Sequence, residues 1–168
     1  MNPISSLCLV IILSFCIFQT QADLVTQTCA TTRYKDLCEN TLRADPSSKT
    51  GDIHVLAKIA LRAAAKKLKS IQGQIDKQIK STTDKYTLQA LNDCAENYDG
   101  AGEQISDSLT AIESKRYDDV NIWVTAAMSD ADSCEEGFKP GTSKLTKVNE
   151  KFGQLCSNVL AISNQARG

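Results

Sequence analysis

Aromatic residues, prolines and histidines are scarce in this chain of 168 residues. Aromatic side chains make up 5% of the sequence, and there are three prolines and one histidine. β-Sandwiches rely on aromatic and β-branched strands with frequent turns, so this composition favours a helical protein of one domain. The formal net charge of −1 lacks the basic excess that is typical of nucleic-acid-binding domains. We therefore expect no nucleic-acid partner.

The sequence also lacks the motifs of common enzyme classes. It contains no glycine-rich phosphate loop, no serine-nucleophile elbow and no Cys-x-x-Cys pair. The one histidine, His54, lies on the apolar stripe of an expected helix, where a packed residue is a commoner role than a catalytic base. The cysteines have wide, irregular spacings that do not fit a zinc site. We expect no enzyme activity, no metal and no cofactor.

A long hydrophobic run is found only at the N-terminus. Residues 1–22 carry no charged side chain, and the apolar run over residues 7–18 is followed by the small-residue cleavage site Thr20-Gln21-Ala22. The run is too short to span a bilayer comfortably. The pattern therefore predicts a signal peptide over residues 1–22 and a secreted domain over residues 23–168, with no membrane association after cleavage. There is no Asn-x-Ser/Thr site for N-glycosylation.

Two long amphipathic helices, joined by a tight turn at residues 114–117, are predicted within residues 83–138. In the first, Leu91, Tyr98, Ile105 and Ile112 recur every seven residues, with Ala95, Gly102 and Leu109 as a second row. In the second, three- and four-residue steps connect Val120, Val124, Ala127, Ala131, Cys134 and Phe138. These spacings are typical of helices and do not fit strands.

Cysteine positions allow a geometric check on this helical pair. Cleavage after Ala22 would leave five of the seven cysteines, which in a secreted chain predicts two disulfides and one remaining thiol. Cys94 and Cys134 lie about 28 and 26 Å from the turn at the helical rise per residue. In antiparallel helices they would stand nearly level, close enough to be bridged if the facing angles agree.

The other segments complete an all-α protein. Residues 24–44 predict two short helices, with Cys29 and Cys38 on either side of their junction, where a bridge would close a loop of about ten residues. Asp52 is the expected N-cap of a long helix that ends near residues 81–83, before Asp84 starts the next, and the last helix is predicted over residues 143–165. Over residues 52–165 these elements predict an up-down-up-down four-helix bundle, preceded by the short helical hairpin.

Each of three further features of the sequence allows two interpretations. Lys66, Lys67 and Lys69 form a cluster that is typical of a solvated helix face, although it could attract an anionic partner. Trp123 lies one position away from the Val120/Val124 stripe, where it either widens the core or anchors a partner. Cys156 is either a buried inert thiol, which we favour, or a site of intermolecular pairing.

Five segments with distinctive patterns occur in order along the mature chain. They are Thr28-Cys29 with Tyr34-Lys35-Asp36-Leu37-Cys38, Ala44-Asp45-Pro46-Ser47-Ser48, Leu91-Asn92-Asp93-Cys94-Ala95-Glu96-Asn97-Tyr98, Ser133-Cys134-Glu135-Glu136-Gly137-Phe138, and Leu155-Cys156-Ser157-Asn158. Together they resemble the plant invertase and pectin methylesterase inhibitor family. The resemblance implies a short helical hairpin on a four-helix bundle, disulfides Cys29–Cys38 and Cys94–Cys134, and a free thiol at Cys156. It also implies a monomeric secreted inhibitor, in the apoplast or cell wall, with the vacuole as an alternative.

The turn before the third bundle helix bears on the inhibited enzyme. Family members that inhibit invertases often carry Pro-Lys-Phe there, whereas this chain has Tyr117-Asp118-Asp119. The carboxylates of a glycosidase active site would repel Asp118 and Asp119. The sequence Tyr117-Asp118-Asp119-Val120-Asn121-Ile122 resembles the corresponding segment of pectin methylesterase inhibitors and of pollen-allergen-like relatives. We therefore expect steric, one-to-one inhibition of pectin methylesterase, with acid invertase as the alternative and a carrier of hydrophobic ligands as a distant one.

The resemblance places the enzyme-binding surface on the two helices that contain Cys94 and Cys134. The partner-binding residues that it implies are Glu96, Tyr98, Asp99, Tyr117, Asp118, Asp132 and Glu135. Tyr98 also fits the apolar stripe of its helix, where it would be a core residue instead. Carboxylates at such an interface would make the affinity pH-dependent.

Overall fold

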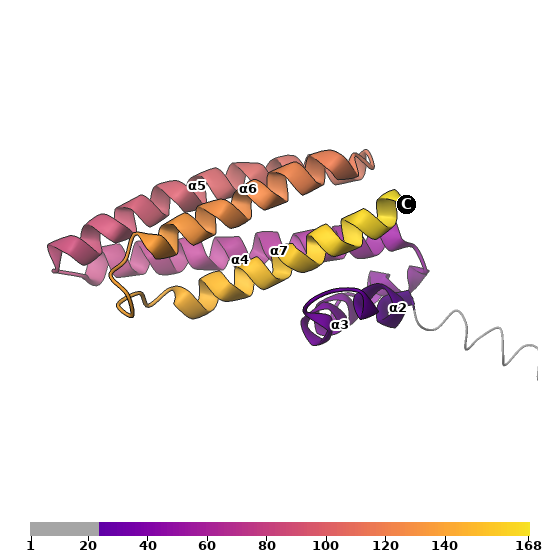
Figure 1. Ribbon diagram of the computed structural model, residues 1–168, viewed down its shortest axis with the longest axis horizontal. Coiled ribbons are helices and arrows are strands. Elements are labelled where there is room, and N and C mark those ends of the chain that lie inside the picture. The colour runs from indigo at the N-terminus through magenta and orange to yellow at the C-terminus, as the bar shows by residue number, and fades with distance from the viewer. Residues whose placement is uncertain (1–23) are drawn as a thin grey trace, which may run out of the picture.

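The computed structural model describes residues 24–168 as a layered helical bundle (Figure 1). Two short helices come first, α2 (Leu24–Ala30) and α3 (Lys35–Arg43), followed by a 3₁₀ turn, η1 (Pro46–Thr50). The four long helices are α4 (Ile53–Ser81), α5 (Lys85–Glu113), α6 (Tyr117–Glu136) and α7 (Thr146–Arg167). The all-α bundle that the sequence predicts is therefore confirmed. The predicted signal peptide and its cleavage site lie outside the described residues.

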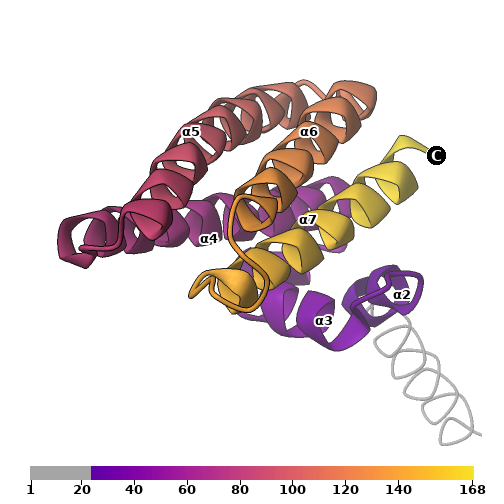
Figure 2. The ribbon, with the colours of Figure 1, turned by 60° about the vertical axis from the view of Figure 1, so that its left-hand side comes forward.

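The long helices form two layers, α5 with α6 and α4 with α7 (Figure 1). The short hairpin of α2 and α3 packs on the outer side of the α4/α7 layer, at the end where α4 begins and α7 finishes (Figure 2). Its position is fixed by two side chains of α7. Asn158 donates to the Tyr34 carbonyl at 3.1 Å, and Gln165 donates to the Thr28 carbonyl at 3.0 Å.

Aspartates begin the two longest helices. The carboxylate of Asp52 accepts a hydrogen bond from the His54 amide at 2.8 Å, and that of Asp84 accepts one from the Thr87 amide at 2.8 Å. Each bond satisfies one backbone donor that the first helical turn leaves unpaired. The extended backbone of Thr82 ends α4. These boundaries agree with the sequence prediction because caps are local interactions.

The first of the two predicted rows on α5 is fully buried, whereas the second is only partly buried, with Ala95 and Leu109 packed against the edge of the core. Leu91, Tyr98, Ile105 and Ile112 are all buried. The second buried row, however, consists of Cys94, Ala101 and Ser108, whereas Ala95, Gly102 and Leu109 are partly exposed. Cys94 is bonded to α6, so the row that leads from it is the one that the neighbouring helix covers. Heptad spacing alone does not tell on which side of a helix the nearest partner lies.

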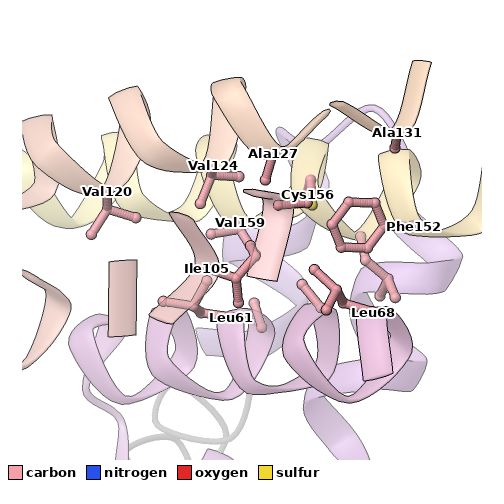
Figure 3. Packing of buried hydrophobic residues seen from close by; sticks show 14 of the residues in the cluster. Leu61, Leu68, Ile105, Val120, Val124, Ala127, Ala131, Phe152, Cys156 and Val159 are labelled. Atoms are coloured by element: carbon pink, nitrogen blue, oxygen red, sulfur yellow. The ribbon is translucent and has the colours of Figure 1, made fainter. Parts of the chain in front are cut away.

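The core fills the space between the two layers. Figure 3 shows side chains from all four long helices converging there, among them Leu61, Leu68, Ile105, Val120, Val124, Phe152 and Val159. Phe152 is completely buried and packs against the Tyr98 ring at a centroid distance of 6.0 Å. Cys156 is buried in the same core and is the free cysteine of the described chain. Within residues 24–168, no helix is long and apolar enough to cross a membrane.

Candidate functional site

Helices α5 and α6 are bound closely to each other. A disulfide joins Cys94 to Cys134, with the two Cα atoms 4.4 Å apart. Farther along the pair, a Cβ atom at Gly100 would lie 3.2 Å from the Asp130 carboxylate, so the absence of a side chain there permits the close approach of α6. The disulfide and this contact fix the register of the two helices. The outer surface of the pair is therefore a rigid face.

This face is strongly acidic. Helix α5 carries six carboxylates and one lysine, and α6 carries six carboxylates and no cation, which gives the layer a net charge of −11. Helix α4 carries seven cations and one carboxylate, and α7 carries three cations and one carboxylate, which gives the other layer a net charge of +8. The chain's overall charge of −1 conceals this separation. The two acidic helices are consecutive in the chain and pack side by side.

Three carboxylates of the acidic layer are neutralised by ion pairs. Glu113 lies 2.6 Å from Lys58 of α4, and Arg116 contacts Asp119 at 2.9 Å. Asp118 pairs with Arg167 at the end of α7. In the part of the chain that the structure describes, the other nine carboxylates of α5 and α6 form no ion pair. Most of the acidic charge thus remains available to a partner.

The hydrogen bond from Lys58 is the largest of the effects that lower the pKa of Glu113 below its ordinary value. The charges of Lys58 and Arg62 lower it further. This carboxylate is fully exposed, so its interaction is screened by solvent. The contact nevertheless ties the last turn of α5 to α4, which helps to position the α5–α6 turn.

Of the seven predicted partner-binding residues, Tyr98 and Tyr117 are buried and the prediction for them is wrong. Tyr98 is completely buried, and its hydroxyl donates to the Asn149 side-chain carbonyl at 2.8 Å. Burial also raises the pKa of Tyr98. Tyr117 is 8% exposed, and its hydroxyl lies 2.9 Å from Nδ1 of His54. Both tyrosines connect helices inside the bundle instead of contacting a partner.

Glu135 is also engaged within the fold. Its carboxylate accepts hydrogen bonds from Ser143 at 3.0 Å and from the Asn149 amide at 2.9 Å, and Thr146 donates to it as well. These donors hold the connection between α6 and α7 against the end of α6. A carboxylate with three internal donors has little remaining capacity for a partner.

The four remaining residues, Glu96, Asp99, Asp118 and Asp132, are exposed but do not form one cluster. Asp99 accepts a hydrogen bond from Gln72 of α4 at 3.2 Å, so it lies on the side of α5 that faces α4. Glu96 precedes it by three residues and shares that side. Asp132 precedes Glu135 by three residues and therefore lies on the α7 side of α6. The predicted residues thus occupy opposite flanks of the α5/α6 face.

The sequence interpretation that favoured a core position for Trp123 is wrong. Trp123 is 38% exposed, and its neighbour Ile122 is 62% exposed. Together with Asp107, Thr110 and Arg116 they line a shallow pocket of about 270 Å³ on the acidic face. The offset of Trp123 from the Val120/Val124 stripe was the signal for this position. Exposed aromatic side chains with a polar rim are common at the centres of protein interfaces.

The residue types that most often bind metals or act as nucleophiles occupy structural positions in the described chain. Among them, no group of three or more histidine, cysteine, aspartate or glutamate side chains could hold a metal ion. Burial raises the pKa of the Cys156 thiol, which disfavours the reactive thiolate. The ring of His54 packs edge-on against Tyr117.

Comparisons with known proteins give a consistent result. The model of the family described as "Plant invertase/pectin methylesterase inhibitor" matches residues 23–162. The chain is 33% identical over 161 residues to a Platanus orientalis protein named "Putative invertase inhibitor", and the match covers 94% of each chain. It is 28% identical over 148 residues to the "Pectinesterase inhibitor" of Actinidia deliciosa, covering 86% of this chain and 80% of the relative.

A solved structure is similar in fold. The crystal structure of mutant form A of a pectin methylesterase inhibitor from Arabidopsis superimposes with a TM-score of 0.74. The match covers 85% of this chain and 97% of that one at 20% sequence identity. Similarity at this level of identity supports the arrangement of the helices and carries no information about the bound enzyme.

Proposed function

Because the chain belongs to the plant invertase/pectin methylesterase inhibitor family, a family of enzyme inhibitors and not of enzymes, we propose that it inhibits a plant pectin methylesterase. It binds the enzyme one to one and covers the pectin-binding cleft with the α5/α6 face. The signal peptide predicted over residues 1–22 directs it to the secretory pathway and to the cell wall, where pectin occurs.

The acidic charge of the α5/α6 face is the observation that carries this proposal. Pectin is a polyuronate, and each ester that the enzyme hydrolyses leaves a carboxylate on the polymer. A cleft that works along such a polymer must accept negative charge. A rigid layer of net charge −11, with nine carboxylates free of ion pairs in the described chain, offers similar charge to that cleft.

A role for Ile122 and Trp123 as the apolar centre of the interface follows from their exposure. Charged residues set the association rate and specificity of a complex, whereas buried aromatic anchors supply much of its affinity. Both side chains are exposed on α6 and face away from the core. We therefore place Trp123 in a pocket of the enzyme, with carboxylates such as Asp107 around it. The inhibitor acts by excluding substrate and undergoes no chemical change.

The test is a titration of purified mature protein against a plant pectin methylesterase, with methanol release as the measure of activity. We expect inhibition to be complete near one equivalent. The variant Glu96→Gln/Asp99→Asn removes two charges from the face, and Asp36→Asn/Glu39→Gln removes two from α3 as a matched control. The first should weaken inhibition, and the second should not. Undiminished enzyme activity at stoichiometric excess of the wild type would contradict the proposal.

Acid invertase is the second candidate. It is favoured by the identity of 33%, over 94% of both chains, to the Platanus orientalis protein named "Putative invertase inhibitor". The acidic charge of the α5/α6 face argues against invertase, because glycosidases rely on two carboxylates at the reacting bond. Those carboxylates would repel an acidic face. A parallel assay of sucrose hydrolysis decides between the two enzymes, since inhibition of invertase alone would replace the first proposal.

The distant alternative of a hydrophobic-ligand carrier receives no support from the interior. The apolar gap between α3, α4 and α7, lined by Leu42, Ala60 and Ile162, has no room even for a water molecule. A lipid chain needs a far larger cavity.

A further inference from the structure

The shallow pocket that Trp123 lines lies on the acidic face, where α5 and α6 meet near their turn. Its lining consists of Asp107 and Thr110 from α5 with Arg116, Asp119, Ile122 and Trp123 from the beginning of α6. Three large hydrophobic side chains are exposed in the described chain, and two of them belong to this lining. Apolar surface and charge therefore occur together here, within a recess of about 270 Å³. We call it the Trp123 pocket.

One charge of the Trp123 pocket is not balanced from within the protein. Arg116 and Asp119 neutralise each other at a distance of 2.9 Å. Asp107 is exposed, and among the described residues it has neither an ion pair nor a hydrogen bond from a side chain. The pocket as a whole therefore has a charge of −1, and it attracts a cation from a partner.

The other side chains of the pocket suit a cation with a flat, weakly hydrated surface. The indole ring of Trp123 is the aromatic ring whose face attracts cations most strongly. The Thr110 hydroxyl donates to the Ser106 carbonyl at 3.3 Å, so its oxygen lone pairs are left to accept. A carboxylate, a hydroxyl oxygen and an indole face together match the planar surface and the five donors of a guanidinium group.

We propose that the Trp123 pocket binds an arginine side chain of the pectin methylesterase, with the guanidinium between the Asp107 carboxylate and the Trp123 ring. This inference rests on the proposed function and names the group of the enzyme that the acidic face recognises. The arginine belongs to the wall of the enzyme surface that receives Trp123. A lysine fits less well, because its compact ammonium is strongly hydrated and offers the indole no planar surface.

An arginine in this pocket gives the acidic face a specificity that net charge does not provide. Carboxylates spread over the face accelerate association with any basic surface. A guanidinium that is enclosed between an indole ring and a carboxylate is bound by shape and by hydrogen bonds as well. An enzyme without an arginine at this place is attracted to the inhibitor but held weakly. Asp107 and Trp123 are therefore specificity-determining residues of the inhibitor.

The first test compares two carboxylates of α5 by calorimetric titration with a plant pectin methylesterase. Asp107→Asn removes the charge of the pocket. Glu103→Gln removes an equal charge that is also exposed, one helical turn earlier and outside the pocket lining. We expect the first change to weaken binding at least about thirtyfold and the second at most about fivefold. Asp107→Glu, which keeps the charge, should recover part of the loss, and thermal unfolding checks that each variant is folded.

The second test identifies the arginine of the enzyme. Phenylglyoxal modifies accessible arginines, so mass spectrometry of the free and the complexed enzyme should show one that the inhibitor protects. Its replacement by alanine should weaken binding of the wild-type inhibitor at least about thirtyfold. With that enzyme variant, Asp107→Asn should cost at most about twofold more, because the two changes remove the same contact.

A third measurement follows the pocket itself. Trp123 is the one tryptophan of the chain, so the isotope-labelled inhibitor has a single indole N–H signal in NMR spectra. Addition of the unlabelled enzyme should shift this signal. The signal of the free inhibitor should be independent of its concentration, because the pocket receives the enzyme and not a second copy of the chain.

Four outcomes would overturn the inference while the proposed function stands. They are equal losses from Asp107→Asn and Glu103→Gln, no arginine protected in the complex, an indole signal that the enzyme does not shift, and additive losses in the double-variant pair. A concentration-dependent shift in the free inhibitor would also overturn it, by assigning the pocket to a second copy. Absence of any complex with the wild-type inhibitor would instead contradict the proposed function, and the inference with it.

Discussion

The two layers of the bundle have the same architecture and opposite character. Each consists of two antiparallel helices that contribute to one core. The α5/α6 layer has a net charge of −11, is closed by a short turn and carries the Cys94–Cys134 disulfide. The α4/α7 layer has a net charge of +8, has no disulfide between its helices and is partly covered by the short hairpin.

This difference shows what the disulfide stabilises. Helices α5 and α6 both carry an excess of carboxylates, and like charges on adjacent helices repel each other. The covalent bond lies in the layer with the greater like-charge repulsion. The disulfide therefore offsets part of the repulsion between two packed helices of the same charge.

Removal of this disulfide should have the largest effect. The variant Cys94→Ala/Cys134→Ala loses a bridge between residues 40 apart in sequence, which the chain-entropy model values at about 4 kcal/mol of unfolding free energy. The matched variant Cys29→Ala/Cys38→Ala opens a much shorter loop and should lose about 3 kcal/mol. Guanidinium unfolding measures both. A smaller loss from the first variant than from the second would contradict this view of the α5/α6 layer.

Substitution of Trp123 tests the anchor on the acidic layer. The change Trp123→Ala should weaken the complex with pectin methylesterase by about 2 kcal/mol, or about thirtyfold, as is usual for an aromatic hot spot. Inhibition constants provide the measurement. Tyr86→Ala is the control, because Tyr86 is exposed on α5 and lies away from the proposed anchor. Equal inhibition by both variants would remove Trp123 from the interface.

The hydrogen bond between Tyr98 and Asn149 joins the two layers through the core. The change Tyr98→Phe leaves the buried side-chain carbonyl of Asn149 without its donor, at a cost of about 1–2 kcal/mol of unfolding free energy. The same measurement on Tyr86→Phe should show almost no change, because that side chain is exposed. A loss as large in the control would mean that the effect comes from elsewhere than this bond.

The ion pair between Lys58 and Glu113 joins the layers at the surface and should have the smallest effect. The folded state lowers the pKa of Glu113, so its contribution to stability is present above the unfolded pKa and is lost as pH falls through the folded one. In Lys58→Met, the pKa of Glu113 should rise toward its ordinary value. Titration of the carboxyl group by NMR measures the shift, and an unchanged pKa would contradict the assignment of Lys58 as its main cause.

Local features of the fold could be predicted from the sequence. The caps at Asp52 and Asp84, the α5–α6 turn and the main apolar rows depend on residues close in the chain, and they agree with the structure. The predictions that failed concern contacts between residues that are far apart in the chain. Trp123 is partly exposed because it lies in a surface pocket beside Asp107 of α5, and Tyr117 is buried because it packs against the distant His54.

The candidate site was predicted only in part for the same reason. The resemblance pointed to α5 and α6, but Tyr98 and Glu135 have hydrogen-bond partners on α7 or in the loop before it. Partners of this kind are selected by packing. No spacing along α5 or α6 predicts them.

The sequence by itself determined the helices, their order and their apolar stripes, because helix propensity, capping and periodicity act over a few residues. It also determined the charge of each helix. The tertiary structure decided which side of each helix a neighbour covers and that α7, although far from α4 in the chain, packs beside it, because all four apolar stripes are buried in one core. A net charge of −1 thereby becomes two layers of opposite sign.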